Sequence, residues 1–600
     1  MMKFKIFTHV ILFIFLTNNL WSQITVTSDT DLQNKVNAAN PGDVFIVSNG
    51  TYEDFYASFT VHGTEENPII IKAETVGGVT LTLDSHFVFK KASHIVLEGF
   101  IFDCTGNNTL VKLEASNNIR ITRNEFELTT ERSMKWIVIT GYYNDYTFQF
   151  LSHHNRIDHN IFKNKTTAGN FITIDGTYNE DKTNNQQSQY DRIDHNYFYK
   201  TSPRLENEKE AVRIGNSQLS TSNGFTTVEF NLFEECDGDP EIVSVKSNDN
   251  IIRHNTFKGN YGTLTLRQGN RNLVEGNYFF GDDKENGIFI DDEDKEQTIY
   301  TGGLRVHGTD HVIINNYFEG LKGTIFDAPI TLTQGDAITG LDTDQSLHYR
   351  AERITIAYNT LVNNTYGIEL GYAKGNGSYD KELKDIVFVN NVVTGSENNL
   401  VKFHEDQVEN VEWKNNIMHT TGSANLVNDG YTFTVNEIKQ QNPNLTLDGS
   451  IWIATENTPL LEKGLLDLNI EEDIEGQLRP LISNPGADHY SLSEKKYRSI
   501  TINDVGPNAY ENTMSLDRDI SLVSRAIIYP NPTRDLVEIS IINPQKIIEL
   551  TLYNVIGELV KKEFINNKEV MLDLNNLTKG VYFLKIRNGN KHETHKIIKE

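Results

Sequence analysis

The sequence predicts an all-β protein, a right-handed parallel β-helix followed by a small C-terminal β-sandwich module. Three observations point to this fold. A strand-like phrase that ends in Asn-x-Phe recurs along the chain, and its closest copies are about one solenoid coil apart. From residue 526 the pattern changes to alternating β-branched positions with Pro and Gly. Six hundred residues also exceed one compact core, so more than one folded unit is expected.

The first segment, residues 1–23, has the pattern of a secretory signal peptide. Lys3 and Lys5 precede an apolar run from Ile6 to Leu16, which is too short to span a bilayer. No later segment is apolar enough to cross a membrane. The mature chain is therefore expected to begin near Gln23 and to be secreted or held at the cell surface.

Residues 24–508 are predicted to form the β-helix. Short apolar strands alternate with loops, and a turn-prone asparagine returns at steps of 22 to 43 residues. The shortest steps define a bare coil, and the longer ones carry loop insertions. Asparagine suits a tight corner because it tolerates left-handed backbone and because its amides can stack in a ladder. The recurring asparagines are Asn124, Asn160, Asn196, Asn231, Asn255, Asn277, Asn316, Asn359, Asn391 and Asn416.

Charge and cysteine content limit the possible functions. A formal net charge of −27 argues against a nucleic-acid binder. It also means that a polyanionic substrate would need a locally basic surface, and basic residues outnumber acidic ones within 241–275. Cys104 and Cys236 lie several predicted coils apart, so both are expected to be buried and structural rather than disulfide-bonded.

Two parallel segments, EIVSVKSND (241–249) and GTLTLRQGN (262–270), place Lys246 over Arg267, 21 residues apart. A step of that size is about one coil, so the two cations are predicted to stand one rung apart, roughly 5 Å, on an outer face. Segments 210–218 and 302–310 extend the alignment. The two outward columns then contain Arg213, Ser244, Thr265 and Arg305, and Gly215, Lys246, Arg267 and His307.

Acidic residues line up beside these cations. Glu241 aligns with Glu210, Asp239 aligns with Glu208, and Asn207 is adjacent. Oxygen ligands from Asp, Glu and Asn suit Ca²⁺, whereas zinc would need His or Cys ligands. The acids therefore predict either a calcium site or a charge network that balances Lys246 and Arg213.

At these residues the chain resembles polysaccharide lyase family six, the alginate lyases and chondroitinase-B-like enzymes. The similarity is carried by EAVRIGNS, NLFEECDGDPEIVSVKSNDNIIRHNTF, GTLTLRQGNRNLVEGNYFFG and GGLRVHG, and extends from about residue 25 to the RPL and DVGP phrases at 479–507. The resemblance implies that Lys246 is the base and Arg267 the acid or charge stabiliser. It places Asn207, Asp239 and Glu241 where calcium ligands are expected.

Other residues of this face complete the predicted site. Those expected to contact the substrate are Arg213, Arg271, Arg305, His307 and Gln268, and Glu210 is expected to join the metal or the charge network. Two positions depart from the family pattern. Asp239 stands where the family often has Glu, a shorter reach that could loosen the metal. Gln268 stands where a His often follows the arginine, which could alter the pH response or the substrate contacts.

The last 75 residues, 526–600, closely resemble the C-terminal sorting domain of the type nine secretion system. The resemblance rests on Tyr529-Pro530-Asn531-Pro532, on Gly557, on Lys579-Gly580-Val581-Tyr582 and on the basic tail. It implies export across an outer membrane by the type nine secretion machinery. Residues 509–525 are expected to be the linker.

Together these features predict a secreted polysaccharide lyase that cleaves a uronic-acid polymer by calcium-assisted β-elimination. Alginate is favoured because the resemblance over the chain leans that way, and a chondroitin or dermatan sulfate lyase is the nearest alternative. A β-helical glycoside hydrolase would need clustered aspartates on the outer face; the run Asp291–Asp294 lies in an insertion and has no partner there. A non-catalytic protein that binds polysaccharide at the cell surface is the remaining alternative.

Overall fold

The computed structural model forms two compact units, residues 1–510 and 511–600. The predicted signal peptide up to residue 22 and the linker from residue 510 lie outside the described residues. The structure describes residues 23–130, 132–142, 150–177, 185–339, 344–375, 377–395, 397–404, 408–462, 470–509, 526–529, 533–541, 548–554, 558–567, 569–588 and 591–599.

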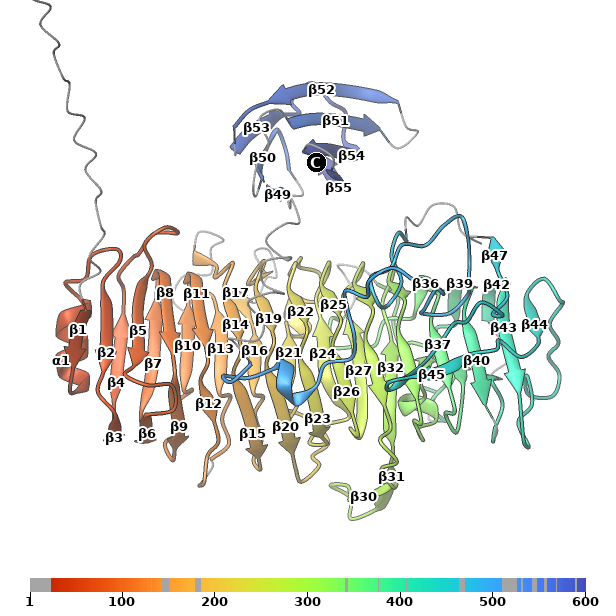
Figure 1. The fold of residues 1–600 in the computed structure, drawn as a ribbon, viewed down its shortest axis with the longest axis horizontal. Helices are drawn as coiled ribbons and strands as arrows, with labels where there is room; N and C mark the ends of the chain where they lie inside the picture. The colour runs from red at the N-terminus through yellow and green to blue at the C-terminus, as the bar shows by residue number, and fades with distance from the viewer. Residues whose placement is uncertain are drawn as a thin grey trace, which may run out of the picture. The chain divides into compact units, whose positions relative to one another are not determined.

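The first unit is a parallel β-helix, as predicted, and its coils follow one another in chain order (Figure 1). Three parallel sheets of 14, 12 and 14 strands run along it. One 14-stranded sheet runs from β1 (Gln23–Val26) to β42 (Val408–Lys414), and the other from β3 (Gly50–Glu53) to β44 (Ile438–Gln440). At the first coil, helix α1 (Asp29–Val36) is capped at its N-terminus by Ser28, whose hydroxyl accepts a hydrogen bond from the Asp31 amide.

The 12-stranded sheet carries the predicted site. Its strands are β4 (Tyr56–Phe59), β7 (His86–Lys90), β10 (Val111–Glu114), β13 (Ile137–Thr140), β16 (Ile172–Ile174), β21 (Val212–Ile214), β24 (Glu241–Lys246), β27 (Gly262–Gln268), β32 (Thr301–Val306), β35 (Ile330–Leu332), β38 (Ile368–Leu370) and β41 (Val401–Phe403). In each strand alternate residues point into the core, as the period of two requires.

The recurring asparagines form the predicted ladder. All ten are fully buried, and each side-chain amide donates to the side-chain oxygen of the next at 3.0 or 3.1 Å. Behind them the phenylalanines of the phrase stack inside the core, for example Phe257 on Phe279 at 4.7 Å. One detail differs from the prediction. The left-handed residue is the one before the asparagine, such as His195 (φ 54°), and not the ladder residue itself.

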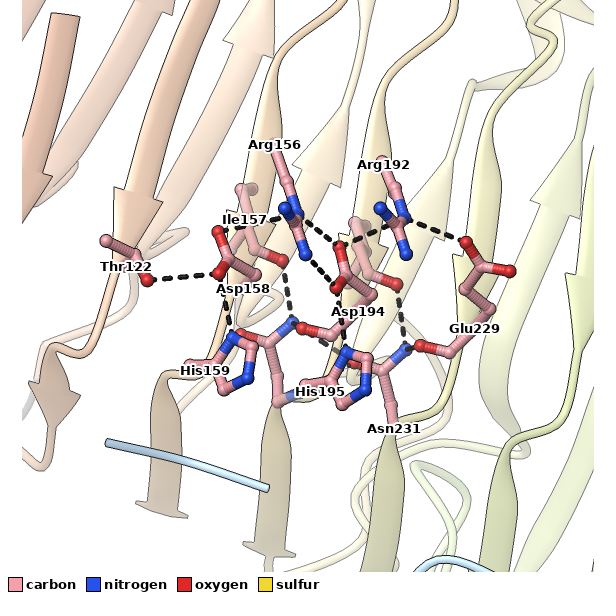
Figure 2. A network of polar contacts seen from close by, with 12 residues as sticks. Thr122, Arg156, Ile157, Asp158, His159, Arg192, Asp194, His195, Glu229 and Asn231 are labelled. Carbon is pink, nitrogen blue, oxygen red and sulfur yellow. Dashed lines mark hydrogen bonds and ion pairs between the residues drawn. The ribbon is translucent and has the colours of Figure 1, made fainter. Parts of the chain in front are cut away.

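A second ladder, made of ion pairs, lies on the outer face of the sheet that contains β14 (Arg156–Asp158), β19 (Arg192–Asp194) and β22 (Thr227–Glu229) (Figure 2). Each arginine reaches the acid of the next coil. Arg156 donates to both carboxylate oxygens of Asp194 at 2.8 and 2.7 Å, and Arg192 donates to Glu229 at 2.8 Å. Asp194 and Glu229 are buried, so these pairs tie neighbouring coils together in a low-dielectric setting.

After the last coils the chain runs back along the β-helix. Hydrogen bonds fix its course: the Trp452 amide donates to the Tyr317 hydroxyl at 3.0 Å, the Ala487 amide to Thr360 at 2.8 Å, and the Gly506 amide to the His195 carbonyl at 3.0 Å. Residues 451–462 and 470–506 therefore cover coils whose strands come much earlier in the sequence.

The second unit is a small antiparallel β structure with its own apolar core, which agrees with the predicted C-terminal module. Of the motifs that carried the resemblance, Pro530–Pro532 and Gly557 lie outside the described residues. Its three-stranded sheet contains β49 (Ala526–Tyr529), β50 (Leu536–Ile541) and β53 (Glu569–Asp573); its four-stranded sheet contains β51 (Ile548–Asn554), β52 (Leu559–Ile565), β54 (Gly580–Asn588) and β55 (Lys591–Lys599).

Candidate active site

The register of β24 on β27 departs from the predicted alignment at the key position. Val243, Ser244 and Val245 pair with Leu264, Thr265 and Leu266 as the sequence indicates. The register then shifts, and Lys246 pairs with Gln268 instead of Arg267. The prediction that Lys246 stands directly over Arg267 is therefore wrong at the backbone, because a β-bulge inserts one extra residue into β27.

Lys246 nevertheless lies next to a buried acid. Its ammonium nitrogen is 3.7 Å from Oε1 of Glu210, whose residue is only 1% exposed. The other oxygen of Glu210 accepts a hydrogen bond from the Asn170 amide, while Oε1 has no hydrogen-bond partner within the described part of the chain. Lys246 thus provides the positive charge nearest to an otherwise uncompensated oxygen.

Arg267 pairs with the neighbouring acid, Glu241. Its Nε is 3.4 Å from Glu241 Oε1, and its buried Nη1 finds no hydrogen-bond partner in the described ranges. The second oxygen of Glu241 accepts a hydrogen bond from the Ser244 hydroxyl. Burial alone would raise the pKa of Glu241, but the charges of Lys246, Arg267 and Arg305 lower it. Both predicted catalytic side chains therefore act on the same carboxylate.

The two acids predicted to bind calcium, Asp239 and Glu241, are engaged by other groups of the protein. Asp239 accepts hydrogen bonds from the backbone amides of Lys209 and Glu241, at 3.1 and 2.9 Å, so both of its oxygens are engaged. Asn207 is exposed, and its side chain makes no hydrogen bond in the described part of the chain. Glu241 is engaged by Ser244 and Arg267.

Glu210 is the third acid of this group, beside Asp239 and Glu241. Burial raises the pKa of Asp239 well above its usual range, and repulsion from the carboxylates of Glu210 and Glu241 raises it further. Within the described ranges, however, no group of three or more His, Cys, Asp or Glu side chains is arranged to hold a metal ion. The side chains as they lie fit the charge-network alternative better than the calcium site.

Two other basic residues of the predicted columns are Arg213 and Arg305. Arg213 pairs with Ser244, Ser244 with Thr265, and Thr265 with Arg305, so these four residues form the predicted column. Arg305 is 9% exposed, stacks over the Phe326 ring at 4.3 Å and donates to the Tyr379 hydroxyl at 3.3 Å. These two arginines line the same face as Arg267.

His307 does not add charge to this face. It is fully buried, and its Nε2 accepts a hydrogen bond from Arg305 Nε at 3.0 Å. Burial, followed by the charge of Arg305, holds its pKa well below the usual range, so the ring is neutral. In this position His307 orients Arg305, and its contact with the substrate stays a prediction.

Two further residues that were predicted to contact the substrate form hydrogen bonds with other parts of the protein. Gln268 is fully buried, and its side-chain amide donates to the carbonyls of Gln345 and, at 3.2 Å, of Leu347. Arg271 makes a two-pronged bond to Asp249, at 2.8 and 2.7 Å. Gln268 therefore anchors a loop, and Arg271 stabilises a corner of the coil; contact of either side chain with the substrate stays a prediction.

Sequence reasoning missed two aromatic groups of the site, His348 and Tyr379. Burial lowers the pKa of His348, and the charges of Arg267, Arg305, Lys374 and Lys246 lower it further. The ring is therefore neutral among cations, 5.1 Å from the Tyr379 ring. Both residues lie in insertions outside the repeating strands, so no repeat alignment could reveal them.

Comparison with known proteins decides the family. A chondroitinase B profile matches residues 26–449, more than half of the chain. The chain belongs to the chondroitinase B family. A second profile, for a secretion system C-terminal sorting domain, matches residues 527–600 of this family member. No curated protein matches it in sequence.

Solved structures similar to this chondroitinase B family member include lyases of polysaccharide family six. The alginate lyase AlyGC is 25% identical with a TM-score of 0.60, and the match covers 81% of this chain and 58% of that one. The chain thus spans little more than half the length of AlyGC. A mannuronic acid specific family 6 lyase from human gut microbiota is 23% identical with a TM-score of 0.55, covering 67% of this chain and 87% of that one.

A third relative is the alginate lyase AlyF-OU02, solved in complex with G6. It is 20% identical with a TM-score of 0.57, and the match covers 81% of this chain and 95% of that one. At these identities the second and third structures establish the shared fold of the family only. Among the described residues of this family member, no helix has the length and apolar composition needed to cross a membrane.

Proposed function

We propose that this protein is a secreted polysaccharide lyase that cleaves a uronic-acid polymer by β-elimination, with Lys246 as the base and Arg267 as the charge stabiliser. The observation that carries the proposal is the placement of these two side chains beside the buried carboxylates of Glu210 and Glu241, on a face that also holds Arg213 and Arg305. An acidic chain thereby presents a cationic surface suited to an anionic polymer.

The proposed reaction is a β-elimination at a uronate residue of the polymer. The deprotonated amine of Lys246 takes the C5 proton of a uronate, and the C5–H electrons become the new C4=C5 double bond. The C4–O bond breaks, and the departing oxygen takes a proton from solvent water to leave a free hydroxyl end. Negative charge builds on the uronate carboxylate while the proton leaves, and the guanidinium of Arg267, held in a buried setting, stabilises it.

Calcium assistance is the finer part of the prediction. The family resemblance implies it, but the oxygens of Asp239 and Glu241 are already engaged by backbone amides, by Ser244 and by Arg267. These residues do not fit a bound ion as they are arranged, so no step of the proposed reaction goes through a metal. Calcium at this position stays a prediction.

We favour alginate as the substrate. The support is the likeness to AlyGC, an alginate lyase that is 25% identical over 81% of this chain. Chondroitin or dermatan sulfate is the second candidate, because the matching family profile is that of chondroitinase B. Alginate has only carboxylates, whereas the second candidate also carries sulfates.

The sorting domain implies export across the outer membrane, so we propose that the enzyme works outside the cell or on its surface. The signal peptide at residues 1–23 would deliver it to the first membrane. The type nine machinery and an anionic polysaccharide are then its expected partners.

Product analysis tests the function. Full-length protein is incubated separately with alginate, dermatan sulfate and pectin, and the products are followed by ultraviolet absorbance and mass spectrometry. Elimination gives an unsaturated end and adds no water, whereas hydrolysis adds one water per cut. Unsaturated oligomers from alginate support the proposal. Hydrolytic products, or a polymer that is bound but not shortened, would reject it.

A further inference from the structure

A polar pocket lies away from the candidate active site, where the returning segment folds over itself. It has a volume of about 920 Å³ and is formed by residues between 442 and 457 and between 475 and 495. Four carboxylates line it, while Lys495 is its one ammonium group. These acids are Asp448, Glu456, Glu475 and Asp488. The excess of negative charge is the first sign that the pocket accepts a cation.

Glu475 leaves one oxygen unpaired inside this pocket. The residue is only 4% exposed. Its Oε1 pairs with Lys495 at 2.9 Å, but its Oε2 is buried and has no hydrogen-bond partner among the residues that the structure describes. A buried carboxylate oxygen without a partner costs free energy of folding, so a missing positive ligand is expected at this point.

Asp488 supplies a second buried carboxylate. It is 7% exposed, and its Oδ2 accepts a hydrogen bond from the Ala454 amide at 2.7 Å. Burial raises the pKa of Asp488, and repulsion from Asp473 and Glu475 raises it further, to about 7. Asp473 itself is satisfied by the backbone amides of Glu475, Gln477 and His489 at 2.8 to 3.0 Å.

We propose that this pocket binds a divalent cation of the calcium class, with Glu475 and Asp488 as its two anionic ligands. Calcium accepts six to eight oxygen ligands in irregular geometry, and neutral side-chain oxygens and water can complete the shell. Asn442, Thr455 and Gln477 offer such oxygens in the pocket lining. The described residues hold no cluster of three His, Cys, Asp or Glu ligands, which a site completed by neutral oxygens does not require.

The cation would join two stretches of the returning segment. The two stretches already contact each other: Ile451 shares an apolar cluster with Ile474 and Ala487, the Asn484 amide donates to the Thr458 carbonyl at 2.9 Å, and Lys495 pairs with Asp448 at 2.7 Å. An ion held by Glu475 would add a strong link from the inside. Binding is therefore expected to stabilise the cover over the later coils, independently of the candidate active site.

Calcium binding to the full-length protein tests the proposal. Protein stripped with a chelator is titrated with Ca²⁺, and bound calcium is counted by equilibrium dialysis while the thermal midpoint is followed. Glu475→Gln and Asp488→Asn should each bind one calcium fewer than wild type and lose the midpoint rise that calcium gives. Wild type that binds no calcium, or Glu475→Gln and Asp488→Asn variants that bind as much as wild type, would overturn the proposal.

Two controls separate this site from its surroundings. Asp448→Asn removes a carboxylate of the same pocket that is 56% exposed and already paired with Lys495, so it should keep the ion. Glu241→Gln alters the candidate active site and should also keep it. If neither test variant folds, terbium decides: Tyr490 lines the pocket, so Tyr490→Phe should lower sensitised terbium emission, and unchanged emission would reject the site.

Discussion

Lys246 pairs with Gln268 along the strands, yet its ammonium lies 3.7 Å from the carboxylate of Glu210 in the coil before. The bulge that shifts this register leaves Arg267 as the extra residue of β27, and its guanidinium reaches Glu241. An amine and a guanidinium from adjacent coils therefore meet two acids from adjacent coils. The predictions below follow from this arrangement and from the ladders that hold the coils in register.

Removing the guanidinium of Arg267 should impair the chemical step. Arg267→Ala is expected to lower kcat by about 10²- to 10³-fold, since a charge aimed at the developing anion is lost. Steady-state kinetics on alginate measure this. Arg271→Ala is the matched control, because Arg271 is bound to Asp249 and should leave kcat nearly unchanged. Equal losses in the two variants would contradict the assignment.

Gln268 should act on substrate binding through the loop that it anchors. Gln268→Ala removes the hydrogen bonds to the carbonyls of Gln345 and Leu347, next to His348. KM should rise several-fold with a smaller change in kcat, and hydrogen exchange should increase across 345–349. Gln297→Ala, which removes an exposed amide that bonds Asp291, provides the comparison. A fall in kcat at constant KM would argue instead for direct contact with the reacting groups.

The ion-pair ladder should make stability depend on acid pH. Burial alone would raise the pKa of Glu229, but Arg253 and Arg192 lower it from its usual value of 4.5 to about 2. Its stabilising effect is therefore complete above pH 4.5 and is lost as the pH falls toward 2. Glu229→Gln should cost about 3 kcal/mol at pH 7, and the difference from wild type should shrink by pH 3.

Urea unfolding at the two pH values measures this difference. Asp282→Asn, which removes an acid whose side chain is 51% exposed and pairs with Lys258, should change stability by less than about 1 kcal/mol. A Glu229→Gln effect that stays the same from pH 7 to pH 3 would show that the carboxylate charge is not the source of the stability.

A substitution at the centre of the asparagine ladder should lower the stability of the β-helix. Asn255 accepts from Asn231 and donates to Asn277 and to the Val228 carbonyl, all in the interior. Asn255→Ala should destabilise the β-helix by about 2–4 kcal/mol, because several buried polar groups lose their partners. Thermal unfolding checks this, with the exposed Asn398 changed to Ala for comparison. Equal midpoints for both variants would contradict a structural role for the ladder.

The sequence allowed the solenoid and much of its register to be predicted, because inward positions and corner asparagines repeat with every coil. The pairing of Arg213, Ser244, Thr265 and Arg305 follows directly from that repeat. The bulge at Arg267 could not be predicted, since one extra residue in a strand leaves no mark in an alignment without gaps. His348 and Tyr379 reach the site from insertions, whose course is set by tertiary contacts.

The central claim is that Lys246 abstracts the proton that begins elimination. Its most direct test is the rate at which unsaturated product forms from alginate with wild type, Lys246→Ala and Lys258→Ala, the last a partly exposed lysine paired with Glu234 on another sheet. Lys246→Ala should lose activity by at least about 10²- to 10⁴-fold while Lys258→Ala stays near wild type. A correctly folded Lys246→Ala variant with undiminished product formation would contradict the account.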